Sequence, residues 1–226
     1  MCNLYSNTTN PEAMRRLFAV APEEDRLGNL APAPAIHPRA TGAVLRLTRE
    51  GGRRLETMHW GFVLPQVSKR TGKPILPKAV NNARDDRLRA SPFWKASFER
   101  RRCLVPATSF CETKGRAPAT FVWFAMAGEA ARPVFAFAGL WTRYRGRYKE
   151  EEVELDCYTV VTTRPNPLVA EVHPDRMPAI LPPKDWQTWL EGPPDEAAAL
   201  IRPFPAEAMR VVREGVGETA DPAPGP

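Results

Sequence analysis

Cysteine and histidine are scarce in this sequence, and neither residue type is spaced as in a metal site or a disulfide scaffold. The 226 residues include four cysteines, none of them in a C-x-x-C pair, and three widely separated histidines. A disulfide-rich secreted domain and a structural zinc site are therefore not indicated. We expect no metal ion and no cofactor, and the cysteine pattern suits a reducing compartment.

Long apolar runs are also missing. No stretch approaches the roughly 18 to 20 apolar residues that a membrane-spanning helix requires, and the N-terminus lacks the basic and apolar segments of a secretion signal. We therefore expect a cytoplasmic protein that does not associate with membranes, and we expect it to be a monomer. The length favours one domain, residues 1–214. Residues 215–226 are rich in glycine, proline and acidic side chains, and we expect a disordered tail there.

What the sequence does contain is a modest excess of positive charge. Lysine and arginine number 32 against 26 aspartate and glutamate residues, which gives a formal net charge of +6. Such an excess favours an anionic partner, either a nucleic acid or an acidic membrane surface. Charge alone does not choose between the two.

The spacing of apolar residues predicts a mixed α+β fold. Strands are expected where apolar and β-branched residues dominate, at residues 43–48, 55–64, 102–110, 120–126, 133–141 and 153–163. Helical periodicity follows the candidate cap Asn10 and recurs later, at residues 11–18, 86–101, 184–190 and 194–201. Several prolines make residues 31–39 an expected irregular connection. Strands and helices do not alternate regularly, which argues against a parallel doubly wound sheet.

The N-terminus places two candidate nucleophiles on one residue. The sequence begins Met1-Cys2, and a small second residue ordinarily permits enzymatic removal of the initiator methionine. An N-terminal cysteine holds a free α-amine and a thiol on adjacent carbons, a pair that no internal cysteine has. The amine has an ordinary pKa of about 7.7 to 8.0, so a useful fraction is neutral and able to attack an aldehyde. The thiol can then close a ring.

Several motifs follow Cys2 in order along the chain. They are Trp60-Gly61-Phe62, Asn82-Ala83-Arg84, the predicted strand that leads to Glu112, Phe137-Ala138-Gly139-Leu140-Trp141, Thr162-Thr163, His173 and Met177-Pro178. In this ordered set the chain resembles the SOS-response-associated peptidase (SRAP) family of abasic-site processing proteins. The resemblance implies a single domain with a central, barrel-like, mostly antiparallel β core and short peripheral helices. It also implies a positively charged groove that holds single-stranded DNA.

The resemblance further implies covalent chemistry at Cys2. In the family, the N-terminal amine condenses with the aldehyde of a ring-opened abasic site, and the thiol closes a thiazolidine that shields the lesion from strand cleavage. Asn82 then corresponds to the residue that orients the α-amine, and Glu112 and His173 correspond to the groups that move protons. Weak lyase activity at abasic sites, and self-removal of Met1, are secondary expectations.

Four further residues are expected to contact DNA. Arg84 and Arg176 would hold phosphates beside the lesion, because guanidinium groups match phosphate oxygens. Trp60 and Phe62 would stack on neighbouring bases, and packing in the core is the alternative for either ring. A protein bound in this way would be associated with the nucleoid.

The chain departs from the family pattern at three places, one of which is the segment from His173 to Pro178, one residue longer than the commonest form. Many members begin Cys-Gly-Arg-Phe, whereas this chain has Cys2-Asn3-Leu4-Tyr5, so a phosphate contact from the fourth position is absent. Cys111 and Thr113 flank Glu112 where members often have aromatic residues, so the surroundings of this carboxylate are altered. We expect Cys111 to be a small buried residue, and His37 and His59 to be structural or surface residues.

Two other functions remain open from the sequence. The thiol of Cys2 could attack a peptide carbonyl with its own amine as base, as in an N-terminal cysteine peptidase. The basic groove and the aromatic rings could instead form a noncovalent single-stranded DNA binding module. Cys2-dependent cleavage of a peptide would favour the first function, and DNA binding unchanged in Cys2→Ala would favour the second.

Overall fold

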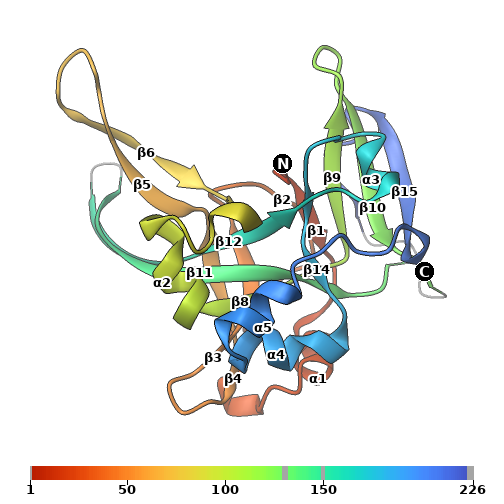
Figure 1. The fold of residues 1–226 in the computed structure, drawn as a ribbon, viewed down its shortest axis with the longest axis horizontal. Helices are drawn as coiled ribbons and strands as arrows, with labels where there is room; N and C mark the ends of the chain where they lie inside the picture. Colours follow the sequence, from red (N-terminus) through yellow and green to blue (C-terminus); the bar gives the residue numbers. More distant parts are fainter. Residues whose placement is uncertain (1, 129–131, 149–150, 223–226) are drawn as a thin grey trace.

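Strands dominate the fold, and short helices lie at its periphery (Figure 1). The structure is a computed structural model that describes residues 2–128, 132–148 and 151–222. Its strands form an eight-stranded sheet, a five-stranded sheet and a two-stranded hairpin. All but two of the pairings between these strands are antiparallel. The mixed α+β class expected from the sequence is confirmed.

The eight-stranded sheet contains a closed ring of five strands. The sheet comprises β3 (Thr41–Leu47), β4 (Arg53–Trp60), β7 (Asn82–Arg84), β8 (Arg102–Ala107), β11 (Phe135–Tyr148), β12 (Glu151–Thr163), β13 (Met177–Pro178) and β14 (Ile180–Leu181). Around the ring β12 pairs with β4, β4 with β3, β3 with β8 and β8 with β11, and β11 pairs back with β12. This ring is the barrel-like core that the family resemblance implies.

The five-stranded sheet carries the amino terminus. It comprises β1 (Tyr5–Asn7), β2 (Ala33–Ile36), β9 (Ser109–Lys114), β10 (Thr120–Met126) and β15 (Met209–Val216), in the order β15-β10-β9-β1-β2. Only Thr108 separates β8 from β9, so the chain passes directly from the ring to this sheet. Because β1 pairs with β9, the segment that begins with Cys2 lies beside the strand that carries Glu112.

Alternate residues of the ring strands belong to two different hydrophobic clusters. On β3, Leu45 packs in a cluster with helix residues such as Phe98 and Trp189. Its neighbour Val44 packs in a cluster with Phe110 and other residues of the five-stranded sheet. Side chains alternate across a strand with a period of two, so both faces of the ring are covered.

The helices are short, and most lie where the sequence predicts them. They are α1 (Pro11–Leu17), α2 (Pro92–Arg100), α3 (Pro167–Ala170), α4 (Trp186–Glu191) and α5 (Pro194–Ala199), with 3-10 turns η1 (Pro22–Glu24), η2 (Asp85–Arg87), η3 (Pro183–Asp185) and η4 (Ala206–Ala208). The Asn10 side chain caps α1 by accepting from the Ala13 amide at 2.8 Å. The helix predicted at 86–101 begins only at Pro92, since the residue before a proline disfavours helical geometry. Within the described ranges, no helix has both the length and the apolarity that a membrane span would need.

A two-stranded hairpin projects from the body of the protein (Figure 1). Its strands are β5 (Phe62–Val67) and β6 (Pro74–Val80). The single strand predicted at 55–64 is broken at Gly61, whose φ of 121° is accessible to glycine. A Cβ at Gly61 would also lie 2.7 Å from the Cβ of Ala79, so the close approach of β6 requires glycine there.

Residues 31–39 are expected to form an irregular connection, but they contain strand β2 (Ala33–Ile36). The prediction is therefore wrong for these four residues. Strand β2 lies at the edge of the five-stranded sheet and pairs with β1 alone. An edge strand needs donors on only one side, and it therefore tolerates Pro34, which has no N–H.

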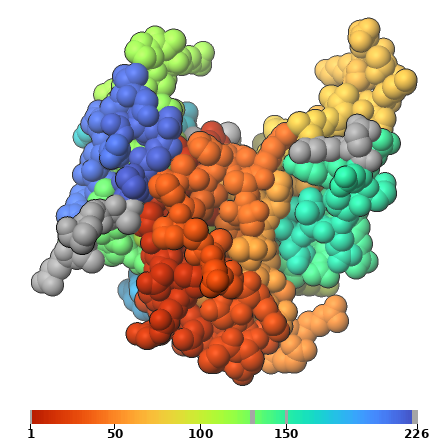
Figure 2. Space-filling model, turned by 180° about the vertical axis from the view of Figure 1, so that it is seen from behind, coloured from red at the N-terminus to blue at the C-terminus, as the bar shows by residue number. Residues whose placement is uncertain are grey.

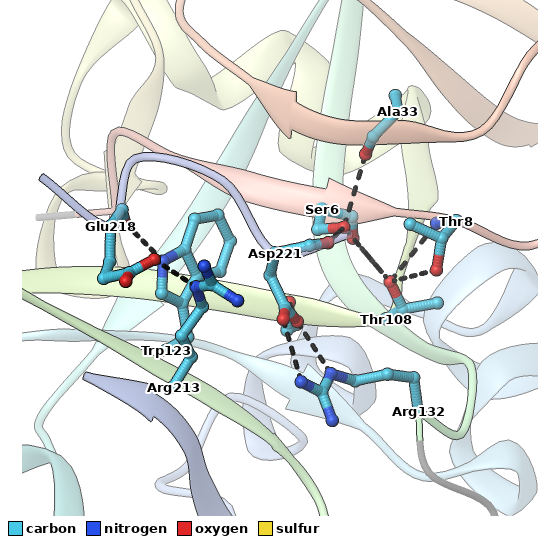
Figure 3. A network of polar contacts seen from close by, with 10 residues as sticks. Ser6, Thr8, Ala33, Thr108, Trp123, Arg132, Arg213, Glu218 and Asp221 are labelled. Atoms are coloured by element: carbon cyan, nitrogen blue, oxygen red, sulfur yellow. Dashed lines mark hydrogen bonds and ion pairs between the residues drawn. The ribbon is translucent and has the colours of Figure 1, made fainter. Parts of the chain in front are cut away.

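The C-terminal segment differs from the disordered tail expected from residue 215 onward. Strand β15 extends to Val216, and the Asp221 side chain is 2% exposed (Figure 3). The Asp221 carboxylate accepts from Arg132 at 2.7 and 2.8 Å and from the Ser109 hydroxyl at 2.6 Å. The Trp123 indole donates to the Glu218 carbonyl at 2.7 Å. These specific contacts order a segment whose composition alone suggests disorder, and residues 223–226 lie outside the described ranges.

Candidate active site

Two neighbouring amides hold the backbone carbonyl of Cys2. The Nδ2 atom of Asn82 donates to the Cys2 oxygen at 2.8 Å, and the Nδ2 atom of Asn81 donates to the same oxygen at 3.1 Å. A carbonyl oxygen can only accept, so the chemistry fixes which end of each amide faces Cys2. The Oδ1 atom of Asn82 is then buried with no hydrogen-bond partner among the described residues. An unused acceptor therefore lies beside Cys2.

The ring of strands positions both asparagines. Asn82 begins β7, which runs parallel to β12 with Asn82 opposite Val160. The Asn81 carbonyl accepts from the Val160 amide at 3.1 Å and from the Trp60 indole at 3.0 Å. Trp60 thus supports the residue that contacts Cys2.

The Cys2 thiol lies in a fully buried position. Burial, together with the negative charge of Glu112, raises the pKa of this thiol well above its ordinary value. Its Sγ donates weakly to the Leu4 carbonyl at 3.6 Å. The thiol is consequently protonated at neutral pH.

Glu112 lies on β9, where it is 3% exposed. Burial raises the pKa of its carboxyl from 4.5 to about 7, and the positive charge of the amino terminus opposes this shift. A carboxyl with a pKa near the ambient pH can both accept and donate a proton, which suits general acid and base catalysis.

His173 follows the short helix α3 and is half-buried. Its backbone amide donates to the Val169 carbonyl at 2.8 Å, and its Nδ1 accepts from the Arg176 amide at 3.2 Å. Burial lowers the pKa of the imidazole, and the charge of the amino terminus lowers it further. A neutral imidazole that accepts at Nδ1 carries its proton on Nε2, where it can act as a donor.

A pocket of about 210 Å³ lies beside Glu112. Asn3, Leu4 and Glu112 line it, together with His37 and Cys111. Cys111 is a buried free cysteine, as expected. The exposed His37 lines this pocket, a position that the sequence does not reveal.

A hollow separates two raised parts of the molecule (Figure 2). One is the β5–β6 hairpin, and the other is the five-stranded sheet (Figure 1). The space-filling view from behind shows the same hollow between the two raised parts (Figure 2). Cys2 itself is buried in this structure.

The two arginines expected to bind phosphate differ in their surroundings. Arg84 is half exposed and pairs with Asp86 through two hydrogen bonds of 3.0 and 2.7 Å. The Arg176 side chain is 12% exposed, pairs with Asp85 at 2.7 Å and donates to the Thr162 carbonyl. An exposed ion pair is easily exchanged for a phosphate contact, whereas Arg176 would have to leave the partly exposed Asp85 and the buried Thr162.

The two aromatic rings expected to stack on bases are buried in this structure. Trp60 is 0% exposed and lies parallel to the ring of Tyr158, with centroids 6.2 Å apart. Phe62 is 3% exposed and packs against Trp94 with a centroid separation of 5.1 Å. Neither ring presents a free face to a base here, because the ring of strands and α2 cover them.

Asn81 is the site residue that the sequence leads one to overlook. Next to Asn82, it looks like a turn residue, and only the structure shows that both side chains reach Cys2. A metal site is not apparent: in the part of the chain that the structure describes, no group of three or more His, Cys, Asp or Glu side chains could hold an ion.

Comparisons with known proteins identify the family of this chain. The family model described as SOS response associated peptidase (SRAP) matches residues 1–218. The abasic site processing protein YoqW of Bacillus subtilis is 29% identical over 196 residues, which cover 83% of each chain. The abasic site processing protein YobE of the same organism is 28% identical over 196 residues, which cover 83% of this chain and 85% of YobE.

Solved structures show the same fold. A crystal structure of a protein from Bordetella bronchiseptica aligns with a TM-score of 0.72 at 26% identity and covers 93% of this chain and 98% of its own. One from Bacteroides thetaiotaomicron aligns with a TM-score of 0.74 at 20% identity, over 94% and 92% of the two chains. The chain therefore belongs to the SOS response associated peptidase (SRAP) family.

Proposed function

We propose that this protein, after removal of Met1, captures abasic sites in single-stranded DNA through a covalent bond to Cys2. The names of the Bacillus relatives support abasic sites as the target. The observation that carries the proposal is the arrangement around Cys2: two amides hold its carbonyl and leave the Oδ1 acceptor of Asn82 unused. That acceptor suits a hydrogen bond from the free α-amine of the mature chain.

The proposed reaction needs no oxidant and no cofactor. The Cys2 amine adds to the aldehyde carbon of the ring-opened deoxyribose and forms a carbinolamine, which loses water to give an imine. The Cys2 sulfur then adds to the imine carbon, and the thiol proton moves to the nitrogen. The product is a thiazolidine, and water is the only leaving group.

Glu112 and His173 are suited to the proton transfers. The Glu112 carboxyl, with a pKa of about 7, can accept a proton from the attacking amine and return it to the departing water. His173, neutral and protonated on Nε2, can donate to the ring oxygen of the sugar as the aldehyde is released. Both transfers run in either direction, so slow reversal of the crosslink belongs to the proposal.

The buried thiol supports an order in which the amine reacts first. The raised pKa of the Cys2 thiol keeps it protonated, and a protonated thiol is a poor nucleophile toward a peptide carbonyl. An imine carbon is a stronger electrophile, and it forms next to the sulfur. The same observation disfavours a thiolate-dependent peptidase.

The DNA would enter the hollow between the β5–β6 hairpin and the five-stranded sheet. Arg84 is exposed and supplies a phosphate contact at the edge of this site. The four groups assigned to the chemistry come from one chain, so we propose that a monomer is sufficient.

A denaturing gel tests the proposal. Mature protein is incubated with single-stranded DNA that contains one abasic site, and a band of lower mobility is expected after denaturation. The band should be absent with undamaged DNA and with Cys2→Ala. Mass spectrometry of the purified protein must show that Met1 is removed, and a mature protein that never attaches to the damaged strand contradicts the proposal.

Cys2→Ser separates the two nucleophiles. This variant keeps the amine but closes the ring poorly, so it should form an imine that borohydride traps. The imine also permits strand cleavage by elimination, and weak lyase activity should rise in Cys2→Ser relative to the parent protein. A variant that crosslinks stably without the thiol would show that the ring is not the product.

A further inference from the structure

A groove of about 910 Å³ shares no lining residue with the pocket beside Glu112. It is formed by the β3–β4 turn, the start of β8 and the middle of β11. In Figure 1 the β3–β4 turn points away from the start of the chain. Eight of the lining residues are arginines, and Glu50 is the one acidic residue among them. We call this surface the arginine groove.

The positive charge of the arginine groove is only partly neutralised. Four of its arginines pair with carboxylates: Arg46 with Glu56, Arg54 with Glu24, Arg143 with Asp156, and Arg145 with Glu154. The other four have no carboxylate partner within the described ranges: Arg49, Arg100, Arg101 and Arg102. An excess of guanidinium groups therefore faces one cavity.

Arg101 shows that this excess is not confined to mobile surface side chains. It is half-buried, and it donates to the Trp141 carbonyl at 3.2 Å and to the Ser97 hydroxyl at 2.9 Å. Burial and the neighbouring charge of Arg100 lower the pKa of Arg101. A guanidinium has five N–H donors, so neutral partners leave donors and charge available to an anion.

A purely structural role accounts for only part of the cluster. Arg102 is buried and donates to the carbonyls of Phe98 and Trp189, which explains it as a packing residue. Arg100 ends α2, where a positive charge suits the helix dipole. Neither reason applies to Arg49, which is exposed on the β3–β4 turn and lines the same groove.

We propose that the arginine groove binds the phosphodiester backbone of a second segment of nucleic acid, separate from the segment held at Cys2. Guanidinium forks from three elements match phosphate oxygens repeated along a strand. The identity of the polyanion rests on the proposed function: DNA attached at Cys2 raises the local concentration of its own flanking segments. An acidic peptide is the competing ligand.

Charge reversal at the two exposed arginines that have no carboxylate partner among the described residues tests the groove. Arg49→Glu with Arg100→Glu should weaken binding of an undamaged single strand of about 40 nucleotides by about tenfold at moderate salt, as measured by fluorescence anisotropy. Loss of two phosphate contacts should also reduce the slope of log affinity against log salt by about 1.4. The milder pair Arg49→Gln and Arg100→Gln should show the same direction and guards against misfolding.

A matched control separates local charge from net charge. Arg16→Glu with Arg26→Glu changes the net charge equally at exposed positions outside the groove, and it should alter affinity by less than about twofold. If DNA affinity falls equally in the control and groove variants, the proposal is overturned. It is also overturned if the groove variants bind DNA with unchanged affinity. Polyglutamate serves as a model of an acidic peptide. If the groove variants lose polyglutamate binding but keep DNA binding, the groove binds an acidic protein segment, and the proposal is overturned.

Covalent attachment is a separate readout. The groove variants should attach to a short abasic oligonucleotide of about 8 nucleotides at the parental rate, because such a strand is held at Cys2 alone. A parent protein that never attaches to abasic DNA contradicts the proposed function, while the anisotropy series still decides the groove. If the short strand attaches more slowly to the groove variants but not to the control variants, the groove belongs to the site at Cys2. That result would overturn the proposal of a separate binding site.

Discussion

At the scale of single residues, Asn81 and Asn82 donate to the same carbonyl oxygen but differ in their expected roles. Both donate to the Cys2 carbonyl, and only Asn82 leaves a buried acceptor unused. Asn82→Ala should slow covalent attachment about 100-fold, because a misplaced nucleophile loses its near-attack geometry. Asn81→Ala should slow it about tenfold or less, since one amide still holds the carbonyl.

Single-turnover gel assays at saturating DNA measure both rates. Asn82→Asp provides the matched comparison, because it keeps the size of the side chain but has no N–H to donate. Because it keeps the acceptor proposed for the amine and Asn81 still holds the Cys2 carbonyl, Asn82→Asp should be slowed about tenfold or less, like Asn81→Ala. An Asn82→Ala protein that reacts at the parental rate would remove Asn82 from the chemistry.

The raised pKa of Glu112 makes the attachment rate depend on pH. If the ionised carboxylate accepts the proton, the rate should rise as pH increases through about 7, the pKa of this group. Glu112→Gln should attach about 100-fold more slowly. The remaining pH dependence of its rate should follow the ionisation of the Cys2 α-amine, with a midpoint of about 8. Rates measured from pH 5.5 to 9 check this. If the parent protein and Glu112→Gln show the same midpoint, a group other than Glu112 causes the pH dependence.

The same shift predicts how stability depends on pH. The folded pKa of Glu112 is raised from 4.5 to about 7, so between these values the folded state binds more protons than the unfolded state. The contribution of Glu112 to the free energy of unfolding is therefore fully present below pH 4.5. It is lost as the pH rises from 4.5 through 7, and the loss is about 3 kcal/mol at most. Glu112→Gln should remove this loss. Urea unfolding of both proteins at pH 5 and pH 8 measures it, and identical pH slopes would contradict it.

The chemistry of the site can be predicted from the sequence better than its surroundings can. The types and order of Cys2, Asn82, Glu112 and His173 are visible in the chain. Which amide touches Cys2, and whether the ring of Trp60 faces solvent, depends on the pairing of β12 with β7 and with β4. Burial is set by contacts between distant segments, and local sequence does not encode it.

At the scale of elements, the C-terminal segment holds the sheet that carries the site. The Asp221 carboxylate binds Arg132 and Ser109, and its carbonyl accepts from Ser6 of β1 at 2.8 Å (Figure 3). Asp221→Ala should destabilise the protein by about 3 to 5 kcal/mol, because Arg132 loses a buried partner.

Glu218→Ala is the matched control for Asp221→Ala. Its carboxylate pairs with Arg213 at a partly exposed position, and the contact from the Trp123 indole goes to its backbone. We expect a loss below about 1 kcal/mol. Urea unfolding measures both variants, and equal losses would mean that the Asp221 network does not stabilise the fold specifically.

Elements with a strong local pattern are predictable, and elements that depend on neighbours are not. Strand β10 has the bounds 120–126 that its apolar residues predict, and α1 begins after its cap. Strands β2 and β6 contain prolines, and β15 is rich in charge, so their sequences do not look like strands. Edge pairing and the contacts of Asp221 decide their conformation, and both arise only in the folded chain.

At the scale of the whole molecule, the hollow between the β5–β6 hairpin and the five-stranded sheet has one side without acidic residues (Figure 2). The β5–β6 hairpin forms one side of the hollow, and residues 57–84 contain no aspartate or glutamate. Lys69 and Lys73 are exposed near its tip. The hairpin pairs with itself alone, so substitutions at its tip should leave the rest of the fold intact.

The hairpin should therefore guide the strand to Cys2 without taking part in the chemistry. Lys69→Glu with Lys73→Glu should lower the attachment rate at limiting DNA by about tenfold at moderate salt and leave the rate at saturating DNA unchanged. Lys95→Glu with Lys184→Glu alters the same net charge on helices α2 and η3 and should have an effect below about twofold. Equal effects in the two pairs would mean that net charge alone attracts DNA. A slower rate at saturation would place the hairpin in the reaction itself, because binding can no longer limit attachment once every molecule holds a strand.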